Sequence, residues 1–344
     1  MNAAIILKEK LIWLDSVRVI STIAVIILHV SAPILYQYGK ISEESWHIGN
    51  FYDGMVRFCV PVFFMLSGAL LLSKDYKLSY FLQKRFWRII PPLIFWSLIY
   101  IFYDYILVGE KYFTLIEFIK MVIRNLFYGS KFHLWFVYTL LGLYLFIPIL
   151  RKWIKNSSNN EILYFLIIWF ATIIYSLPYF KAYLPNIPLT NFSGYIGYLV
   201  LGYYLSNLTL RNKYIPIIFI IIGIGITIYG THYLTQQENK FSSYFYGYLT
   251  PNVLLSSIGV FLIFKNFSIN NKGIKKVILF LSNQSFGIYL VHILILTLLN
   301  KIGINWKFAN PIISIPIISA ICILISSLTI YLLRKIKYGN YISG

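Results

Sequence analysis

Long apolar runs that recur along the whole chain are the feature that most constrains its fold. The first lies within Leu11–Tyr36 and can cross a bilayer, since about 20 helical residues at ~1.5 Å rise span the hydrocarbon. Of the 344 residues, 59% are hydrophobic and 12% are charged, which is more apolar surface than a soluble domain of this size needs. The runs are continuous rather than alternating, which argues against a spanning β-barrel. The sequence therefore predicts an all-α polytopic membrane protein.

The hydropathy pattern predicts about ten transmembrane helices. Their ranges are about 13–35, 52–73, 86–107, 132–151, 161–180, 192–208, 213–233, 245–265, 278–300 and 310–333. The sixth is short and rich in glycine. The segments between the runs are short, and no interdomain linker or convincing repeat is evident, so we expect residues 1–344 to form a single transmembrane domain.

The placement of Lys and Arg predicts that both termini are cytoplasmic, because cytoplasmic segments of membrane proteins carry an excess of these residues. With the N-terminus inside, nineteen of the thirty basic residues lie in inner segments and nine in outer ones, while Arg18 and Arg57 lie within spans. The net charge of +19 thus reflects membrane topology and contact with lipid headgroups, and it does not indicate nucleic-acid binding. In the longest outer segment, about 108–131, apolar residues recur at helical spacing, which predicts an interfacial helix.

The first span contains Asp15, Arg18 and His29. Arg18 and His29 are eleven residues apart, so on a helix they share one stripe about 16 Å apart in depth. Ionisable residues inside a span are costly unless they face the protein interior or a wet cavity. A neutral imidazole there can take a proton from a hydroxyl, and Asp15 can pair with Arg18 along the helix. The alternative is a snorkelling Arg18 and a packed His29 bonded to a neighbouring carbonyl.

Two further groups of charges lie in the next spans. Asp53 and Arg57 are four residues apart and can form a salt bridge at a depth close to that of His29. They are candidates for substrate binding or for a purely structural ion pair. At the inner mouth of the third span, Lys84, Arg85 and Arg88 could bind a phosphate-bearing ligand or simply anchor the span.

Pro91 and Pro92 follow this basic group directly. Proline lacks the amide donor that a helix needs, so the pair predicts a break or kink in the third span. The freed backbone groups would then face a cavity.

Aromatic residues and histidines complete the set of candidate residues. His133, Trp135 and Tyr138 open the fourth span and could bind a sugar by stacking and hydrogen bonding, or belong to an interfacial aromatic belt. His292 lies in apolar sequence of the ninth span, where a packed histidine is the simpler interpretation. His47 and His232 are left without a role.

Several familiar chemistries have no support in the sequence. It contains no phosphate-binding loop, nucleophile elbow or HExxH motif in a suitable context. Cys59 and Cys322 fall inside apolar runs and match no metal or disulfide spacing. No metal site and no cleavable signal peptide are therefore expected.

Taken together, these pieces resemble the membrane acyltransferase-3 family, bacterial integral-membrane enzymes that O-acylate cell-surface glycans. The similarity is greatest to the branch of enterobacterial common antigen O-acetyltransferases and biofilm polysaccharide O-acyltransferases. The matching pieces run from the first span to the ninth: LDSVRVISTIAVIILHV with R-x10-H, VPVFFMLSGALLL, KRFWRIIPPLIFW with R-x-x-R, HLWFVYTLLGLYLFIPIL and SFGIYLVH.

The resemblance implies roles for most of the candidate residues. It implies that His29 is the catalytic histidine with Arg18 as its partner. It also implies that Arg85 and Arg88, with Lys84 beside them, serve a cytoplasmic acyl-CoA donor. His133, Trp135 and His292 match recurring family positions. With Tyr138, Asp53 and Arg57 they form the predicted substrate-binding set.

The sequence thus predicts a multi-pass O-acyltransferase of the plasma or inner membrane. The donor would be acyl-CoA, most simply acetyl-CoA, and the acceptor a hydroxyl of an extracytoplasmic or lipid-linked glycan. Membrane lipids are expected as partners, and nucleic acid is not. Direct transfer and an acyl-histidine intermediate are both open. The alternatives are a transporter or flippase for a lipid-linked sugar, and a non-catalytic subunit of a polysaccharide export complex.

Overall fold

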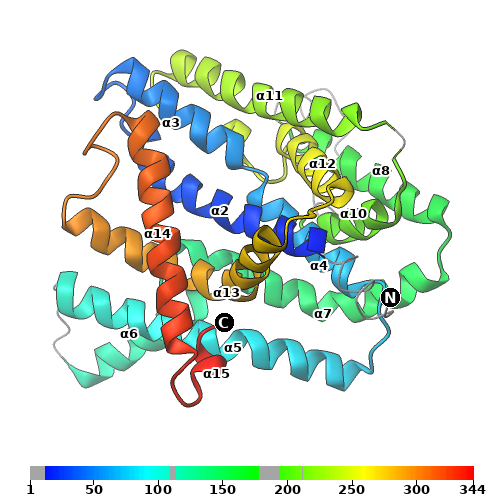
Figure 1. Ribbon diagram of the computed structural model, residues 1–344, viewed down its shortest axis with the longest axis horizontal. Helices are drawn as coiled ribbons and strands as arrows, with labels where there is room; N and C mark the ends of the chain where they lie inside the picture. The colour runs from blue at the N-terminus through cyan, green and yellow to red at the C-terminus, as the bar shows by residue number, and fades with distance from the viewer. Residues whose placement is uncertain (1–11, 109–113, 178–193, 211) are drawn as a thin grey trace. The chain divides into compact units, whose positions relative to one another are not determined.

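The structure is a computed structural model that describes residues 12–108, 114–177, 194–210 and 212–344. Within these ranges the regular structure is entirely helical (Figure 1). The main helices are α2 Ile12–Leu35, α3 Glu43–Val56, α4 Cys59–Leu71, α5 Leu78–Tyr103, α6 Leu115–Tyr128, α7 Trp135–Asn156, α8 Asn159–Tyr175, α10 Ile196–Asn207, α11 Tyr214–Glu238, α12 Pro251–Asn266, α13 Lys272–Lys301, α14 Pro311–Leu333 and α15 Gly339–Ile342. Short turns of helix lie at η1 Asp104–Val108, η2 Phe132–Leu134 and η4 Tyr244–Tyr246.

Eight helical segments of the described chain are long and apolar enough to cross a membrane. They are formed by α2, α3 with α4, α5, α7, α11, α12, α13 and α14. The predicted all-α polytopic class is therefore confirmed. The fifth and sixth predicted spans correspond to shorter helices, α8 with 17 residues and α10 with 12. Part of the range 161–180 lies outside the described residues.

The second span differs from the prediction at its start and in its middle. Its helix begins at Glu43 rather than near residue 52, because the Ser42 side chain accepts a hydrogen bond from the Ser45 amide and caps the helix. The helix then breaks between Val56 and Cys59. Pro61 has no amide hydrogen to donate to the carbonyl of Arg57, which weakens the helix at this point.

The third span also differs from the prediction. Its helix α5 begins at Leu78 rather than near residue 86 and continues through Pro91 and Pro92, so the predicted break is wrong. Buried residues on both sides of the prolines, among them Ile89, Leu93 and Trp96, hold the helix in one piece by packing.

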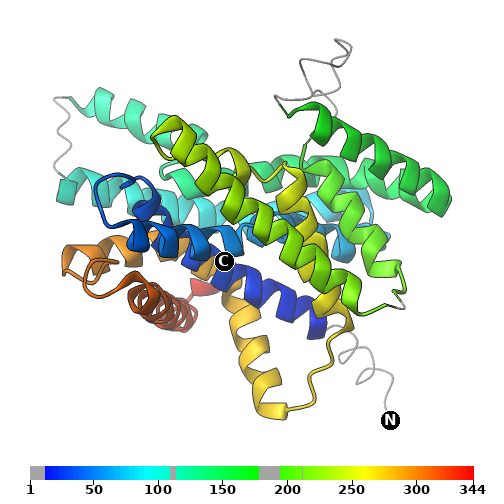
Figure 2. The same ribbon diagram turned by 90° about the horizontal axis from the view of Figure 1, so that it is seen from above.

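The described contacts divide the chain into two compact units, each assembled from separate stretches. Unit 1 is Met1–Asp75, Ile149–Asn283 and Ile304–Ala320. In it α2 packs against α3, α4 and α12, and α4 packs against α10. Helices α11 and α12 lie side by side in both views (Figures 1 and 2).

Two glycines allow α4 and α10 to touch backbone to backbone. A Cβ atom at Gly68 would lie 1.8 Å from the Leu199 carbonyl oxygen, and one at Gly202 would lie 1.9 Å from the Met65 carbonyl oxygen. Any side chain at either position would force the helices apart. Such close packing of small residues is typical of helix pairs in membranes.

Unit 2 is Tyr76–Pro148, Gln284–Gly303 and Ile321–Gly344. It contains α5, α6, η2 and most of α7, with the C-terminal parts of α13 and α14 and with α15. Tyr100 of α5 donates a hydrogen bond to the Leu290 carbonyl of α13 at 2.8 Å and accepts one from the Leu294 amide at 3.1 Å. Helix α15 packs against α5.

Candidate active site

Arg18 is held in unit 1 by partners from two helices. Its Nη1 donates to Asp15 Oδ1 at 3.0 Å and to Ser282 Oγ of α13 at 2.8 Å, while Ser282 Oγ donates to Asp15 Oδ1 at 2.5 Å. The predicted pairing of Asp15 with Arg18 is confirmed. Ser282 contacts both members of this pair and was not among the predicted residues. The guanidinium is therefore fixed against the protein, with 26% of its side chain exposed.

His29 lies on the same helix as Arg18 and is half-buried. Helix α2 is continuous from Ile12 to Leu35, so the eleven-residue spacing keeps both side chains on one stripe, as predicted. Pro33 lies one turn beyond His29 inside this helix and has no amide hydrogen to give to the His29 carbonyl. The backbone at His29 is thus less completely bonded within the helix than at its neighbours.

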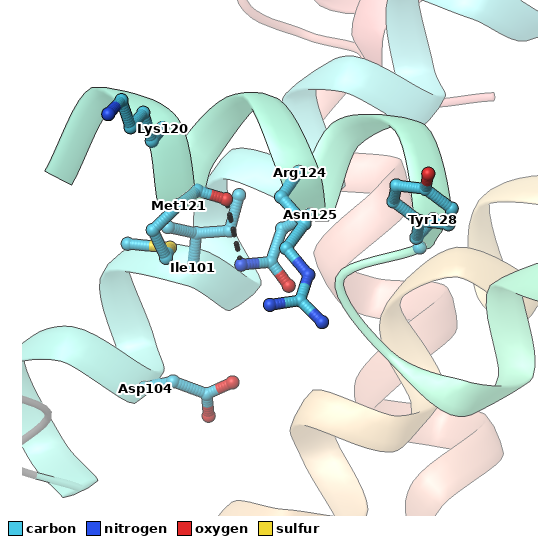
Figure 3. A pocket seen from close by; sticks show the side chains of 8 residues that line it. Ile101, Asp104, Lys120, Met121, Arg124, Asn125 and Tyr128 are labelled. Carbon is cyan, nitrogen blue, oxygen red and sulfur yellow. Dashed lines mark hydrogen bonds between the residues drawn. The ribbon is translucent and has the colours of Figure 1, made fainter. Parts of the chain in front are cut away.

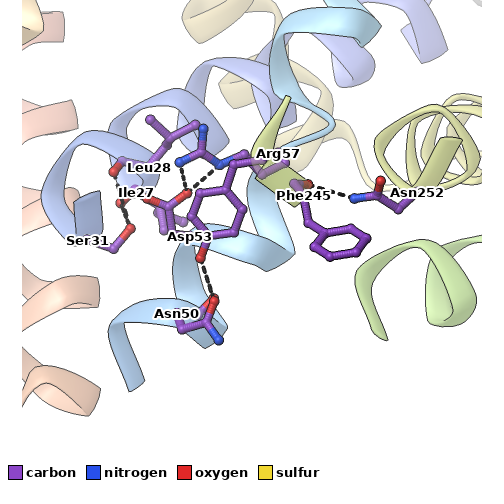
Figure 4. A network of polar contacts seen from close by, with 9 residues as sticks. Ile27, Leu28, Ser31, Asn50, Asp53, Arg57, Phe245 and Asn252 are labelled. Atoms are coloured by element: carbon purple, nitrogen blue, oxygen red, sulfur yellow. Dashed lines mark hydrogen bonds and ion pairs between the residues drawn. The ribbon is translucent and has the colours of Figure 1, made fainter. Parts of the chain in front are cut away.

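Asp53 and Arg57 form the predicted salt bridge beside the break between α3 and α4 (Figure 4). Asp53 is fully buried, while 14% of the Arg57 side chain is exposed. The Arg57 guanidinium lies 4.0 Å from the ring centre of Tyr246, and the Tyr246 hydroxyl donates to Asn50 Oδ1 at 2.6 Å. These contacts give the pair a structural role, and its binding of substrate stays a prediction.

His133 and His292 meet inside unit 2, with ring centres 5.2 Å apart. His133 is 1% exposed and His292 is fully buried, so His133 does not present an open ring at a mouth as its place in the sequence suggested. The His292 Nδ1 donates to the Tyr289 carbonyl at 2.5 Å, which leaves Nε2 as the acceptor nitrogen. The Tyr289 hydroxyl donates to the His133 carbonyl.

Trp135 and Tyr138 lie at the start of α7 and have different surroundings. Trp135 is 37% exposed, as both a sugar-stacking residue and an aromatic belt residue would be. The Tyr138 hydroxyl donates to the Leu126 carbonyl of α6 at 2.5 Å, so it fastens α6 to α7. Neither the exposure of Trp135 nor the hydrogen bond of Tyr138 decides whether these residues bind substrate, so that role stays a prediction.

The structure brings Arg334 near the basic residues Lys84, Arg85 and Arg88 of α5. Lys84 donates to the Tyr80 hydroxyl at 3.1 Å, and the Arg85 guanidinium lies 5.7 Å from the Phe81 ring centre. Arg334, which follows α14, lies close enough to Arg88 that burial and then this like charge lower its pKa. The Arg334 guanidinium itself donates to Ser343 Oγ at 3.1 Å and to the Gly344 carbonyl.

The residues that sequence reasoning missed are Ser282, Tyr246 and Arg334. Ser282 carries a weak signal, as a polar residue in a predicted span. Arg334 was counted only among the inner basic residues, because nothing in its spacing connects it with Arg88. No group of three or more His, Cys, Asp or Glu that could hold a metal occurs in the part of the chain that the structure describes. Cys59 and Cys322 are both free and buried.

The fold and the charged groups inside it define a multi-pass membrane protein. Residues 11–332 match the family model described as "Acyltransferase domain" (Acyl_transf_3), and since the match covers most of the chain, the protein belongs to this acyltransferase family. The chain is similar to a Bacillus subtilis (strain 168) protein named "Putative membrane-bound acyltransferase YfiQ". The two are 25% identical over 354 residues, covering 95% of this chain and 92% of the relative. No solved structure matches the chain.

Proposed function

We propose that this protein transfers an acyl group, most simply acetyl, from cytoplasmic acyl-CoA to a hydroxyl of an extracytoplasmic or lipid-linked glycan. The observation that carries the proposal is the half-buried His29 on the same stripe of α2 as an arginine fixed by Asp15 and Ser282. Keeping Arg18 and His29 inside an apolar helix costs free energy, which favours a functional role for these two residues. Membership in an acyltransferase family gives that role its chemistry.

In the proposed reaction His29 acts as the general base. Its imidazole removes the proton of the acceptor hydroxyl, the resulting oxygen attacks the thioester carbonyl, and the thiolate of CoA leaves and takes up a proton. In the other route consistent with these residues, His29 itself attacks the thioester and holds the acyl group before the acceptor arrives. Both routes need the same imidazole.

The donor is proposed to bind through the phosphates of CoA. Arg85, Arg88 and Arg334 supply the positive charge in unit 2, and guanidinium groups bind phosphate oxygens in pairs.

Replacing His29 tests the catalytic role. With purified full-length protein, radiolabelled acetyl-CoA and a glycan fraction from the host envelope, His29→Ala is expected to lower acyl transfer by about 10²–10⁴-fold, the usual contribution of a general base. The matched control is His47→Ala, since His47 is exposed and has no proposed role. Transfer by His29→Ala at the rate of the His47→Ala control would exclude the mechanism.

A second experiment tests the donor site. Arg88→Gln and Arg334→Gln are each expected to raise the KM for acetyl-CoA by about tenfold, because each removes one charge-assisted phosphate contact worth roughly 1.5 kcal/mol, while kcat changes little. Lys335→Gln, one residue away and exposed, is the control. An unchanged KM in both arginine variants would show that these residues only anchor the helices at the membrane surface.

A further inference from the structure

A cavity of about 580 Å³ lies between α6 and the end of α5, apart from every residue assigned above (Figure 3). Its polar walls are formed by Asp104 on one side and by Lys120, Arg124, Asn125 and Tyr128 of α6 on the other. In Figure 3 the Arg124 side chain points from α6 into this space. Lys120, Arg124 and Tyr128 also line a second cavity, of about 540 Å³.

The wall formed by α6 carries positive charge that the described residues do not neutralise. Asp104, the acidic residue of the lining, is paired with Lys131 at 2.8 Å. Glu117 accepts a hydrogen bond from the Thr114 amide at 3.0 Å and caps the helix. Within the described ranges, no carboxylate lies within ion-pair distance of Lys120 or Arg124. The cavity is therefore matched to an anion.

The same helix carries an uncovered apolar stripe. Ile116, Ile119, Ile123 and Phe127 recur at helical spacing and are between 47% and 75% exposed, and α6 has no buried residue. The helix is nevertheless held in place, because the Phe118 ring packs against Tyr105 with centres 5.2 Å apart. A fixed helix with a bare apolar stripe beside a cationic wall is suited to the boundary between headgroups and acyl chains.

We propose that this cavity binds the phosphate headgroup of an anionic membrane phospholipid, whose acyl chains lie along the stripe of α6. The Arg124 guanidinium can contact two phosphate oxygens at once, and Lys120 adds a point charge. Asn125 keeps one amide hydrogen for the headgroup, since the other is donated to the Met121 carbonyl. The lipid would fasten α6, and with it α5 and α7, to the membrane surface.

The test measures which lipid the purified full-length protein retains. The protein is exposed to equal amounts of phosphatidylglycerol and phosphatidylcholine with identical acyl chains, and bound lipid is counted by native mass spectrometry. The wild type is expected to prefer phosphatidylglycerol. Lys120→Gln and Arg124→Gln should each lower that preference by about fivefold, the effect of one basic residue near a membrane surface. Lys307→Gln, an exposed lysine that does not line the cavity, should leave it unchanged.

A variant that should raise the preference for phosphatidylglycerol distinguishes loss of the lipid site from misfolding, because misfolding would not raise this preference. Asp104→Asn removes the acid and releases Lys131, so the preference for phosphatidylglycerol should rise. Millimolar inorganic phosphate should not displace the lipid, because the apolar stripe adds to its binding. Equal retention of the two lipids by the wild type, equal loss in Lys307→Gln and Arg124→Gln, or displacement by inorganic phosphate would each overturn the proposal.

Discussion

Asp53 and Arg57 show how this protein keeps full charges inside an apolar segment. The carboxylate is fully buried, and its partner on the next turn contacts both the carboxylate and the Tyr246 ring. A buried charge without its partner costs several kcal/mol, although the intact pair adds little net stability. The two residues should therefore be far more sensitive to single replacement than to joint replacement.

This sensitivity can be measured with a double-mutant cycle. Arg57→Gln is expected to lower the free energy of unfolding by about 3–5 kcal/mol, because it leaves the Asp53 carboxylate buried and unpaired. Asp53→Asn combined with Arg57→Gln should recover most of this loss. The measurement is thermal unfolding of the purified protein in detergent. If the double variant is as unstable as the sum of the single ones, the two side chains are not coupled.

At the residue scale, sequence reasoning predicts contacts within one helix and misses contacts between helices. The pairs Asp15–Arg18 and Asp53–Arg57 follow from spacing of three and four residues alone. The contact of Ser282 with Arg18, and that of His133 with His292, depends on how helices pack, and no spacing in one sequence encodes it. The same is true of the approach of Arg334 to Arg88.

At the scale of elements, α4 and α10 pack closely because Gly68 and Gly202 have no side chains. Gly68→Ala would place a methyl group 1.8 Å from the Leu199 carbonyl oxygen, so the helices must separate. We expect a loss of roughly 1–3 kcal/mol or more in stability, the usual cost of overpacking. Thermal unfolding in detergent measures it.

A glycine in open surroundings supplies the control for this prediction. Gly225 lies in α11, and no neighbouring atom of the described chain comes within 4 Å of the position that a methyl group would take there. Gly225→Ala should therefore be neutral or stabilising by about 0.5–1 kcal/mol through helix propensity alone. Equal destabilisation of the two variants would show that close packing of α4 on α10 is not the cause.

The presence of helices was easier to predict than their ends. Long apolar runs predict each helix of the described ranges that can cross the membrane, because hydrocarbon leaves the backbone few alternatives. The ends depend on local chemistry that hydropathy does not register. The Ser42 cap starts α3 nine residues before the predicted range, and packing around Ile89 and Trp96 carries α5 through two prolines.

At the scale of the whole molecule, the distribution of basic residues predicts that both termini face the cytoplasm. Cysteine labelling in intact cells can test this directly, because the native Cys59 and Cys322 are both fully buried and should not react. Lys40→Cys, in a predicted outer segment, should react with a membrane-impermeant maleimide. Lys74→Cys, equally exposed but in a predicted inner segment, should react only after the cells are opened. Labelling of Lys74→Cys in intact cells would invert the topology.

The two prolines in the middle of α5 have one further consequence. Pro91 and Pro92 cannot donate to the carbonyl oxygens of Trp87 and Arg88, which α5 would otherwise satisfy one turn later. Lipid tails offer no replacement donor. Water, a polar group from another part of the molecule or a local change in the helical hydrogen bonds must therefore satisfy these two oxygens.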